Sequence, residues 1–453
     1  MRNSNLRIAM ISDFFYPNVG GVEGHIYELA ECLLELGHKV IIITHAYGEK
    51  QGFCRQGVRY LKKCLKIYYI PIRSIYQQCT LPTLFLTLPI IRDILIREDI
   101  EIVHCHSAFS ALALEGIVHA KTLKLKTIFT DHSLFGFADL SSIIMNKLLQ
   151  WTMVDVDRVI CVSHTSKENT VIRANLKPQK VYVIPNAVDA SQFTPDPTKI
   201  DKNFITVVVV SRLVYRKGVD LLIGIIPVLC QAYPNLRFLI GGDGPKRLGL
   251  EEIREKNNLY SRIILKGSLN PPQVREILRE GDIFISTSLT EAFCIAIVEA
   301  ACCGLKVVST NVGGINEVLP SDLIYLCDAS RDALITKMKE VIDLVIEERK
   351  TGASVSPWCN HAKVRNLYTW NNVAKRTEKV YIEAMKEPVI SDMQRLNNHL
   401  SISAIGGKVF GFILLLELLL FKFLCFWKPA EEIKYFASAE METNNSVLEQ
   451  KLL

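Results

Sequence analysis

Two carboxylates stand eight residues apart in a stretch of otherwise small and apolar residues. Ile283–Ile285 is predicted as a strand and Ala296–Cys303 as a helix, so Glu291 lies in the loop between them and Glu299 lies inside the helix. At about 100° per residue, this spacing leaves the two acids roughly 80° apart on neighbouring faces. A buried acid needs a hydrogen-bonded partner, for which a ribose diol is well suited. The alternative, a surface helix with two solvated acids, is disfavoured by the small apolar residues around Glu299.

Two further loops have residues suited to phosphate. Gly20 and Gly21 follow the first apolar run and precede an amphipathic helix from about Gly24, so their backbone amides can approach an anion at a helix N-terminus. Their spacing is not that of a dinucleotide site, and a plain tight turn is the alternative. Arg212 and Lys217 follow another apolar run, where fixed cations would stabilise a diphosphate as it leaves. The alternative for this second loop is a solvated turn.

Histidines occur at the ends of two predicted strands. His104 and His106 flank Cys105 and point to one side, which would suit zinc, but no further Cys/His cluster is evident nearby in the sequence. We therefore predict no metal site. His132 ends the next strand, and a core histidine bonded to Asp131 is the alternative to a ligand contact there.

Short apolar runs, typical of buried parallel strands, alternate with stretches of helical spacing in two sets. The first set is Arg7–Ser12, Lys39–Thr44, Ile102–His104, Thr127–Thr130, Arg158–Ser163 and Val181–Pro185; the second is Ile205–Val210, Arg237–Gly241, Ile263–Lys266, Ile283–Ser286, Lys306–Ser309 and Leu323–Leu326. The polar, proline-bearing stretch Phe193–Asn203 separates them. The pattern predicts an α/β protein with two Rossmann-like, doubly wound domains facing across a cleft, whose ligands bind beyond the carboxyl ends of the strands.

The segment with the two acids resembles the Glu-x7-Glu signature of retaining nucleotide-sugar glycosyltransferases with two Rossmann-like domains, the GT-B architecture. Three strings, Ser211–Gly218, Thr130–Asp139 and Glu291–Cys294, are similar more narrowly to the catalytic subunits of phosphatidylinositol N-acetylglucosaminyltransferase. The resemblance runs from about Arg7 to about Ala384 and includes a hydrophobic segment near the C-terminus.

This resemblance implies transfer of N-acetylglucosamine from UDP-N-acetylglucosamine to phosphatidylinositol with retention, the first step of glycosylphosphatidylinositol (GPI) anchor synthesis. It implies that Arg212 and Lys217 hold the diphosphate against the glycine loop, and that Glu299 binds the ribose. Glu291 and His132 would contact the sugar. No metal or other cofactor is expected, and the leaving phosphate itself would deprotonate the acceptor hydroxyl. The alternatives are a transferase of the same fold with another acceptor and a non-catalytic scaffold subunit.

Composition agrees with an intracellular, multidomain protein. The 453 residues suggest two or three domains, and a net charge of +6 does not argue for nucleic acid. The thirteen cysteines are odd in number and include no Cys-x-x-Cys pair, so a reducing compartment is expected. Met1–Asn5 runs straight into an apolar strand, so we predict no signal peptide. With a cytosolic supply of UDP-sugar, these features place the catalytic domain in the cytosol.

The C-terminal region predicts a membrane anchor. Val409–Trp427 would form a helix about 28 Å long, enough for a single span of the endoplasmic reticulum membrane. An interfacial or core helix is the alternative, because Glu417 and Lys422 interrupt the stretch. A lone carboxylate facing lipid is costly, so Glu417 is expected to meet another membrane subunit. The tail after the span would be lumenal, and its sequon at Asn444 supplies a topology test.

The predicted boundaries complete the organisation. The domains are residues 1–192 (acceptor side), a linker at 193–203, residues 204–364 (nucleotide-sugar side), a helix at 365–388 that crosses back to the first domain, a juxtamembrane segment at 389–408, the span at 409–427 and the tail at 428–453. The apolar stretch Leu81–Ile96 is predicted as a buried crossover helix. The alternative is a membrane-facing segment that, with the basic residues Lys62, Lys63, Lys66 and Arg73 upstream, would suit an anionic lipid acceptor. We predict no chemical role for Asp243.

Overall fold

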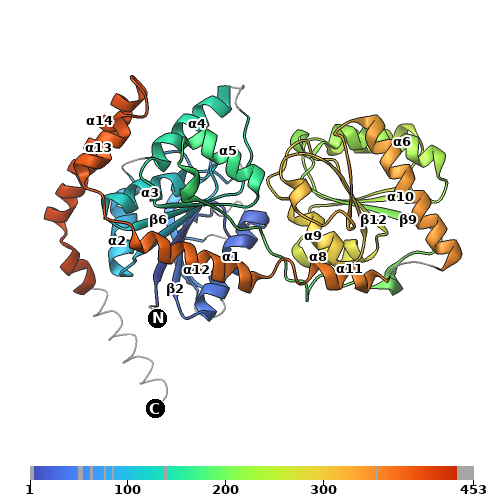
Figure 1. Cartoon of the computed structure of the whole chain (residues 1–453), viewed down its shortest axis with the longest axis horizontal. Coiled ribbons are helices and arrows are strands. Elements are labelled where there is room, and N and C mark those ends of the chain that lie inside the picture. The colour runs from blue at the N-terminus through green and yellow to red at the C-terminus, as the bar shows by residue number, and fades with distance from the viewer. Residues whose placement is uncertain are drawn as a thin grey trace, which may run out of the picture. The chain divides into compact units, whose positions relative to one another are not determined.

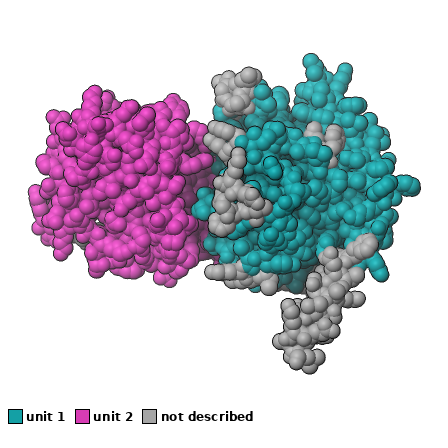
Figure 2. All heavy atoms as spheres, turned by 180° about the vertical axis from the view of Figure 1, so that it is seen from behind, with its two compact units in different colours: residues 1–161, 167–184, 374–453 teal, residues 162–166, 185–373 magenta. Residues whose placement is uncertain are grey.

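The structure, a computed structural model, describes residues 5–48, 55–61, 65–75, 78–83, 86–136, 140–352 and 356–435. The described residues divide into two compact units (Figure 2). Unit 1 falls within residues 1–161, 167–184 and 374–453, and unit 2 within residues 162–166 and 185–373. This division places the predicted linker with unit 2 and the chain after residue 373 with unit 1.

Unit 1 is built on an eight-stranded sheet in the order β3-β4-β2-β1-β5-β6-β7-β8, in which only β3 runs antiparallel. Its strands are β1 (Arg7–Ile11), β2 (Lys39–Ala46), β3 (Gly57–Tyr60), β4 (Lys66–Arg73), β5 (Ile102–His106), β6 (Lys126–Asp131), β7 (Arg158–Cys161) and β8 (Val181–Val183). The strand order reverses between β1 and β5, which is where sheets of this kind form a ligand-binding crevice.

The helices of this unit are drawn in Figure 1, and the second to fifth of them share a buried apolar core with the sheet. They are α1 (Gly21–Glu35), α2 (Leu88–Arg97), α3 (Ala111–Thr122), α4 (Leu140–Met153), α5 (His164–Ala174), α12 (Trp370–Lys386), α13 (Asp392–Leu400) and α14 (Gly406–Trp427). Nearly every residue of α3 is buried, because the sheet covers one side of it and later helices of the chain cover the other.

Unit 2 has a six-stranded, all-parallel sheet in the order β11-β10-β9-β12-β13-β14. The strands are β9 (Ile205–Val210), β10 (Leu236–Gly241), β11 (Ile263–Gly267), β12 (Ile283–Ser286), β13 (Lys306–Thr310) and β14 (Ile324–Cys327); the helices are α6 (Val219–Ala232), α7 (Arg247–Lys256), α8 (Pro271–Arg279), α9 (Ile295–Cys302), α10 (Arg331–Thr351) and α11 (Pro357–Val364). β9 reads Ile-Thr-Val-Val-Val-Val and is almost entirely buried, as expected for β-branched residues in a strand covered on both faces. The strand order reverses between β9 and β12.

The predicted α/β fold with two doubly wound domains is confirmed, but the sequence pattern does not predict β3 and β4. These strands lie in the stretch whose basic residues are assigned to a lipid acceptor only in the alternative prediction. Lys66 pairs instead with the buried Glu98. Burial raises the pKa of Glu98, but hydrogen bonds from its neighbouring lysines outweigh burial and lower it to about 2. The apolar segment that follows contains α2, which connects β4 to β5 as a buried crossover helix. Lys62 and Lys63 lie outside the described residues.

Helix α14 is long and apolar enough to cross a membrane, in agreement with the span predicted at 409–427. One of its faces packs on unit 1, and the Phe410 ring stacks on Trp151 of α4 at 5.1 Å between centroids. The expectation that Glu417 needs another subunit is wrong for this arrangement. The buried Glu417 carboxylate lies 3.0 Å from His119 Nδ1 and accepts a hydrogen bond from Thr122 Oγ1 at 2.9 Å, both on α3.

The C-terminal end of α14 also contacts unit 1. Arg92 of α2 is fully buried and donates a hydrogen bond to the Lys428 carbonyl at 2.8 Å. The Lys428 ammonium pairs with Asp93 at 2.7 Å. The glycosylation sequon at Asn444 lies outside the described residues.

Candidate nucleotide-sugar site

The residues predicted to hold the donor in unit 2 follow the two strands at which the sheet order reverses. Arg212 and Lys217 lie in the loop after β9, and Glu291 lies in the loop after β12. Since β9 and β12 are neighbours and parallel, these loops emerge side by side at the carboxyl edge of the sheet. The structure therefore brings together residues that are 74 positions apart in the chain, such as Lys217 and Glu291.

A closely packed pair of loops holds these side chains. The Lys217 ammonium forms an ion pair with the Glu291 carboxylate, which also accepts a hydrogen bond from Ser288 Oγ at 2.8 Å. The Thr287 hydroxyl donates to the Lys217 carbonyl at 3.0 Å and fixes the loop behind it. Gly218 adopts a positive φ of 64°, and a Cβ there would lie 1.7 Å from the Thr287 carbonyl oxygen. Only glycine allows the two loops to approach this closely.

The glycine-rich loop after β10 supports the loop that carries Arg212. Gly242 and Gly244 have positive φ, and a Cβ at either would collide with the Ser211 or Leu213 carbonyl oxygen. Asp243 accepts the amide of Gly244 at 2.7 Å and lies 3.8 Å from Arg247, so its contacts are those of a structured turn. These contacts give Asp243 a structural role in the turn.

Arg212 is exposed, and among the described residues its guanidinium makes no hydrogen bond or ion pair. A cation at the carboxyl edge of a parallel sheet is well placed to receive an anionic ligand. Lys217 is already paired, so an incoming diphosphate would compete with Glu291 for it. Arg212 therefore offers a positive charge that is not already paired with an acid.

Glu299 lies within α9, as predicted, and Glu291 precedes that helix. Glu299 is partly buried, and burial raises its pKa to about 7. Among the described residues no hydrogen bond or ion pair to its carboxylate is present. Such a carboxylate is poised to accept hydrogen bonds from ligand hydroxyls. Cys294 caps α9 in the left-handed conformation, and burial together with Glu291 raises its pKa to about 12, so its thiol stays protonated.

In unit 1 the two predicted glycines stand at the start of a helix, three residues earlier than the sequence suggested. Gly20 is the N-cap of α1, with extended backbone angles, and Gly21 is its first residue. Gly20 has no side chain that could cap the helix, and a helix N-terminus favours an anion. The loop follows β1, at the point where the order of the first sheet reverses. Glu23 in the first turn lies against Gly20.

His132 follows β6 and is held by the residues on either side of it. The carboxylate of Asp131 accepts the Ser133 amide at 3.1 Å and pairs with Arg173 of α5 at 3.2 Å, both side chains of that pair being fully buried. Among the described residues, no hydrogen bond joins Asp131 to His132. The alternative of a core histidine bonded to its neighbour is therefore not what the structure contains.

Other histidines surround His132, and sequence reasoning missed one of them. His25 of α1, His106 of β5 and His132 carry ring nitrogens that all lie within 4.8 Å of one another. The histidines gather in space although no further Cys/His cluster is evident near His106 in the sequence. His25 has no local sequence signal, because only the fold brings α1 to the end of β5. The prediction that no metal binds here stays a prediction.

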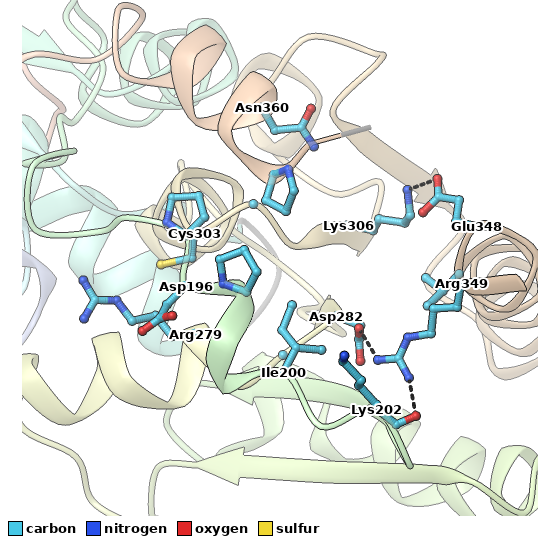
Figure 3. A pocket seen from close by; sticks show the side chains of 16 residues that line it. Asp196, Ile200, Lys202, Arg279, Asp282, Cys303, Lys306, Glu348, Arg349 and Asn360 are labelled. Atoms are coloured by element: carbon cyan, nitrogen blue, oxygen red, sulfur yellow. Dashed lines mark hydrogen bonds and ion pairs between the residues drawn. The ribbon is translucent and has the colours of Figure 1, made fainter. Parts of the chain in front are cut away.

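A cavity of about 510 Å³ lies at the opposite end of the second sheet (Figure 3). Asp282 directly precedes β12 and Lys306 opens β13, so the cavity borders the amino ends of the strands. Two ion pairs lie in its lining, Arg349 with Asp282 at 2.6 Å and Lys306 with Glu348 at 2.8 Å. The cavity is therefore separate from the loops that carry the predicted donor residues.

Comparison with known proteins agrees with this site. Residues 45–139 match the family described as PIGA (GPI anchor biosynthesis), and residues 191–354 match glycosyl transferases group 1. The second match covers all four predicted donor residues of unit 2.

Among solved structures, sucrose-phosphate synthase from Thermosynechococcus elongatus is similar over 84% of this chain and 99% of its own, with a TM-score of 0.69 and 18% identity. Anabaena HepE in complex with UDP and glucose covers 83% and 99%, with a TM-score of 0.64 and 17% identity. These likenesses establish the GT-B fold.

The sequence relatives are closer. A phosphatidylinositol N-acetylglucosaminyltransferase subunit of Homo sapiens is 53% identical over 429 residues, which is 94% of this chain and 87% of the relative. The subunit of the same name from Arabidopsis thaliana is 50% identical over 95% of this chain and 93% of its own length. Identity of this level across both units shows that the chain belongs to the PIGA family of phosphatidylinositol N-acetylglucosaminyltransferase subunits.

Proposed function

We propose that this chain is the subunit that transfers N-acetylglucosamine from UDP-N-acetylglucosamine to phosphatidylinositol, the first step of GPI-anchor biosynthesis. The observation that carries the proposal is the convergence of Arg212, Lys217 and Glu291 at the β9–β12 switch point of a group 1 glycosyltransferase domain. The names of relatives about half identical to this chain support the sugar and the acceptor.

The donor would be held by unit 2 in three parts. Arg212 and Lys217 would bind the diphosphate and stabilise the charge that develops as it leaves. Glu299, at the next helix, would accept hydrogen bonds from the ribose hydroxyls. On donor binding, the Lys217 ammonium would shift from the Glu291 carboxylate toward the diphosphate, and Glu291 would bind a hydroxyl of the sugar. In unit 1, the amides at Gly20 and Gly21 would face the same diphosphate, and His132 the sugar.

The reaction would retain the anomeric configuration without a metal ion. Arg212 and Lys217 supply the positive charge that a metal would otherwise bring to the diphosphate. The departing phosphate oxygen is the base that takes the proton of the acceptor hydroxyl. No cofactor beyond the donor is proposed.

The protein would act in the endoplasmic reticulum membrane with other membrane subunits, its catalytic units on the cytosolic side and its tail in the lumen. The single candidate span among the described residues, α14, supports this location. In a spanning α14, the contacts of Glu417 with His119 and of Lys428 with Asp93 would be replaced by contacts with lipid or with other subunits.

A scaffold subunit is the second candidate function. It is disfavoured because Arg212, Lys217, Glu291 and Glu299 are all present, the first three on the adjoining loops after β9 and β12 and the last on α9, the helix that follows. The experiment that separates the candidates uses microsomes containing this chain, labelled UDP-N-acetylglucosamine and a panel of added acceptor lipids. The proposal expects a labelled lipid only with phosphatidylinositol. Labelling of another lipid instead would support a different acceptor, and labelling that survives loss of Lys217 would support a scaffold.

A further inference from the structure

A hydrogen bond joins two imidazoles of the histidine cluster in unit 1. His106 Nδ1 lies 3.3 Å from His132 Nε2, and the two rings are nearly parallel at 5.6 Å between centroids. His25 packs its ring edge against His132 at 4.7 Å. His106 is fully buried, whereas His132 is partly exposed. His106 is therefore the more buried of the two residues.

Both imidazoles are neutral. Burial, with the neighbouring imidazoles, lowers the pKa of His106 and of His132 well below the ordinary value. A neutral imidazole carries one proton, on either Nδ1 or Nε2, so only one ring of a bonded pair donates. Which ring donates fixes the tautomer of both.

The surroundings of His106 decide between the two arrangements. Its Nε2 is buried and has no hydrogen-bond partner among the described residues. A proton there would leave a buried N–H without an acceptor, which is more costly than leaving a lone pair. His106 therefore holds its proton on Nδ1 and donates it to His132 Nε2. His132 is left with its proton on Nδ1.

We propose that His106 is a positioning residue that holds His132 as the Nδ1–H tautomer, so that His132 presents an N–H donor to the hydroxyl of the donor sugar. The inference rests on the proposed function, in which His132 contacts that sugar. His106 itself touches no substrate in this account.

Helix α12, far along the chain, contacts the histidine cluster through His104. His104 lies two residues before His106 on the same face of β5, and the two rings are in tilted contact at 4.1 Å between centroids. His104 is bonded at Nδ1 to Tyr381 of α12 at 2.7 Å and at Nε2 to Thr130 at 2.7 Å. Hydrogen bonds at both nitrogens hold the His104 ring in place. Burial and His25 lower its pKa to about 3, so the ring is neutral. His106 consequently has little freedom to rotate away from His132.

The test compares three substitutions of His106 in the full membrane complex. Asn places its amide near the position of Nδ1, Gln places its amide near Nε2, and Leu has no polar group. We expect His106→Asn to keep transfer within about threefold of the native rate, and His106→Gln and His106→Leu to lower kcat/KM for UDP-N-acetylglucosamine about tenfold or more. The inhibition constant for UDP, which has no sugar, should stay the same in all three.

The outcomes separate this inference from the function beneath it. His132→Ala is measured in parallel: if it leaves transfer unchanged, the sugar contact in the proposed function is wrong and this inference falls with it. If His132→Ala lowers transfer but Asn at 106 is as slow as Gln and Leu at equal thermal stability, the positioning role is overturned. Three near-native variants would overturn it as well. Should His106→Leu fail to fold, the Asn and Gln pair decides, because each keeps a polar amide.

Discussion

Replacing Lys217 by Ala is the sharpest test of the proposal that this residue binds the donor diphosphate. Its ammonium has two expected partners: the Glu291 carboxylate in the free protein and the diphosphate once the donor binds. Side-chain exposure is 20% for Lys217 and 11% for Glu291, so the pair is mostly shielded from water. The substitution removes the cation and leaves Glu291 with the hydrogen bond from Ser288.

The effect on folding should be small and the effect on turnover large. A pair this shielded contributes about 1–2 kcal/mol, somewhat more than an exposed ion pair. A unit stable by about 5 kcal/mol would still be about 99% folded after that loss. Removing one preorganised group that stabilises developing negative charge typically lowers kcat about 10²–10³-fold. A loss of folded protein therefore cannot account for the expected loss of activity.

The assay is single-turnover transfer by the purified complex, with thermal unfolding measured on the same samples. Lys337→Ala is the matched control, since Lys337 forms an exposed ion pair with Glu340 in the same unit. The control should keep native turnover and Lys217→Ala should lose about two orders of magnitude or more. Turnover within threefold of native in a folded Lys217→Ala protein would refute the assignment.

Three further predictions concern the acids and the anchor. Calorimetry should find that Glu299→Ala weakens UDP binding about 10–100-fold, because the ribose loses hydrogen bonds to a charged group. Glu291→Ala should weaken binding of the intact donor more than binding of UDP. Equal effects on UDP would contradict this division. Because burial raises the pKa of Glu299 to about 7, and the ionised carboxylate is the better acceptor, uridine affinity should rise with pH through neutrality. The Glu299→Gln variant should show a flat profile; a flat native profile would refute the ribose contact. If α14 spans the membrane, cysteines replacing Asp93 and Lys428 should resist a short bifunctional maleimide in intact microsomes, with each single variant as a control. Cross-linking there would place both ends of α14 on unit 1.

The strands and the site loops are predictable from sequence for one physical reason. Strands covered on both faces read as continuous β-branched runs, and the strand predicted at Ile205–Val210 has the same bounds in the structure. Residues that follow such runs must gather at one sheet edge, which predicts that Arg212, Lys217 and Glu291 lie at that edge. The contact between Lys217 and Glu291 is not predictable in this way, because it depends on β9 and β12 being neighbours.

Three features could not be predicted from the sequence, each for a physical reason. β4 begins and ends with a basic residue and contains a proline, so it lacks the apolar signature of its neighbours. His25 lies on a helix face with ordinary spacing, and its place beside His132 follows from tertiary packing alone. Glu417 looks costly in the sequence because a helix sequence does not show which face is buried; in the structure its carboxylate meets His119 and Thr122.

The central claim is that this chain itself carries out the transfer. The most direct measurement reconstitutes the membrane complex with either the native chain or the Lys217→Ala chain, supplies labelled UDP-N-acetylglucosamine and phosphatidylinositol, and identifies the lipid product and its anomeric configuration. The account predicts α-linked N-acetylglucosaminyl phosphatidylinositol from the native complex and at least about 100-fold less from the variant at equal assembly. Equal product from both complexes would contradict it, because catalysis would then reside elsewhere in the complex.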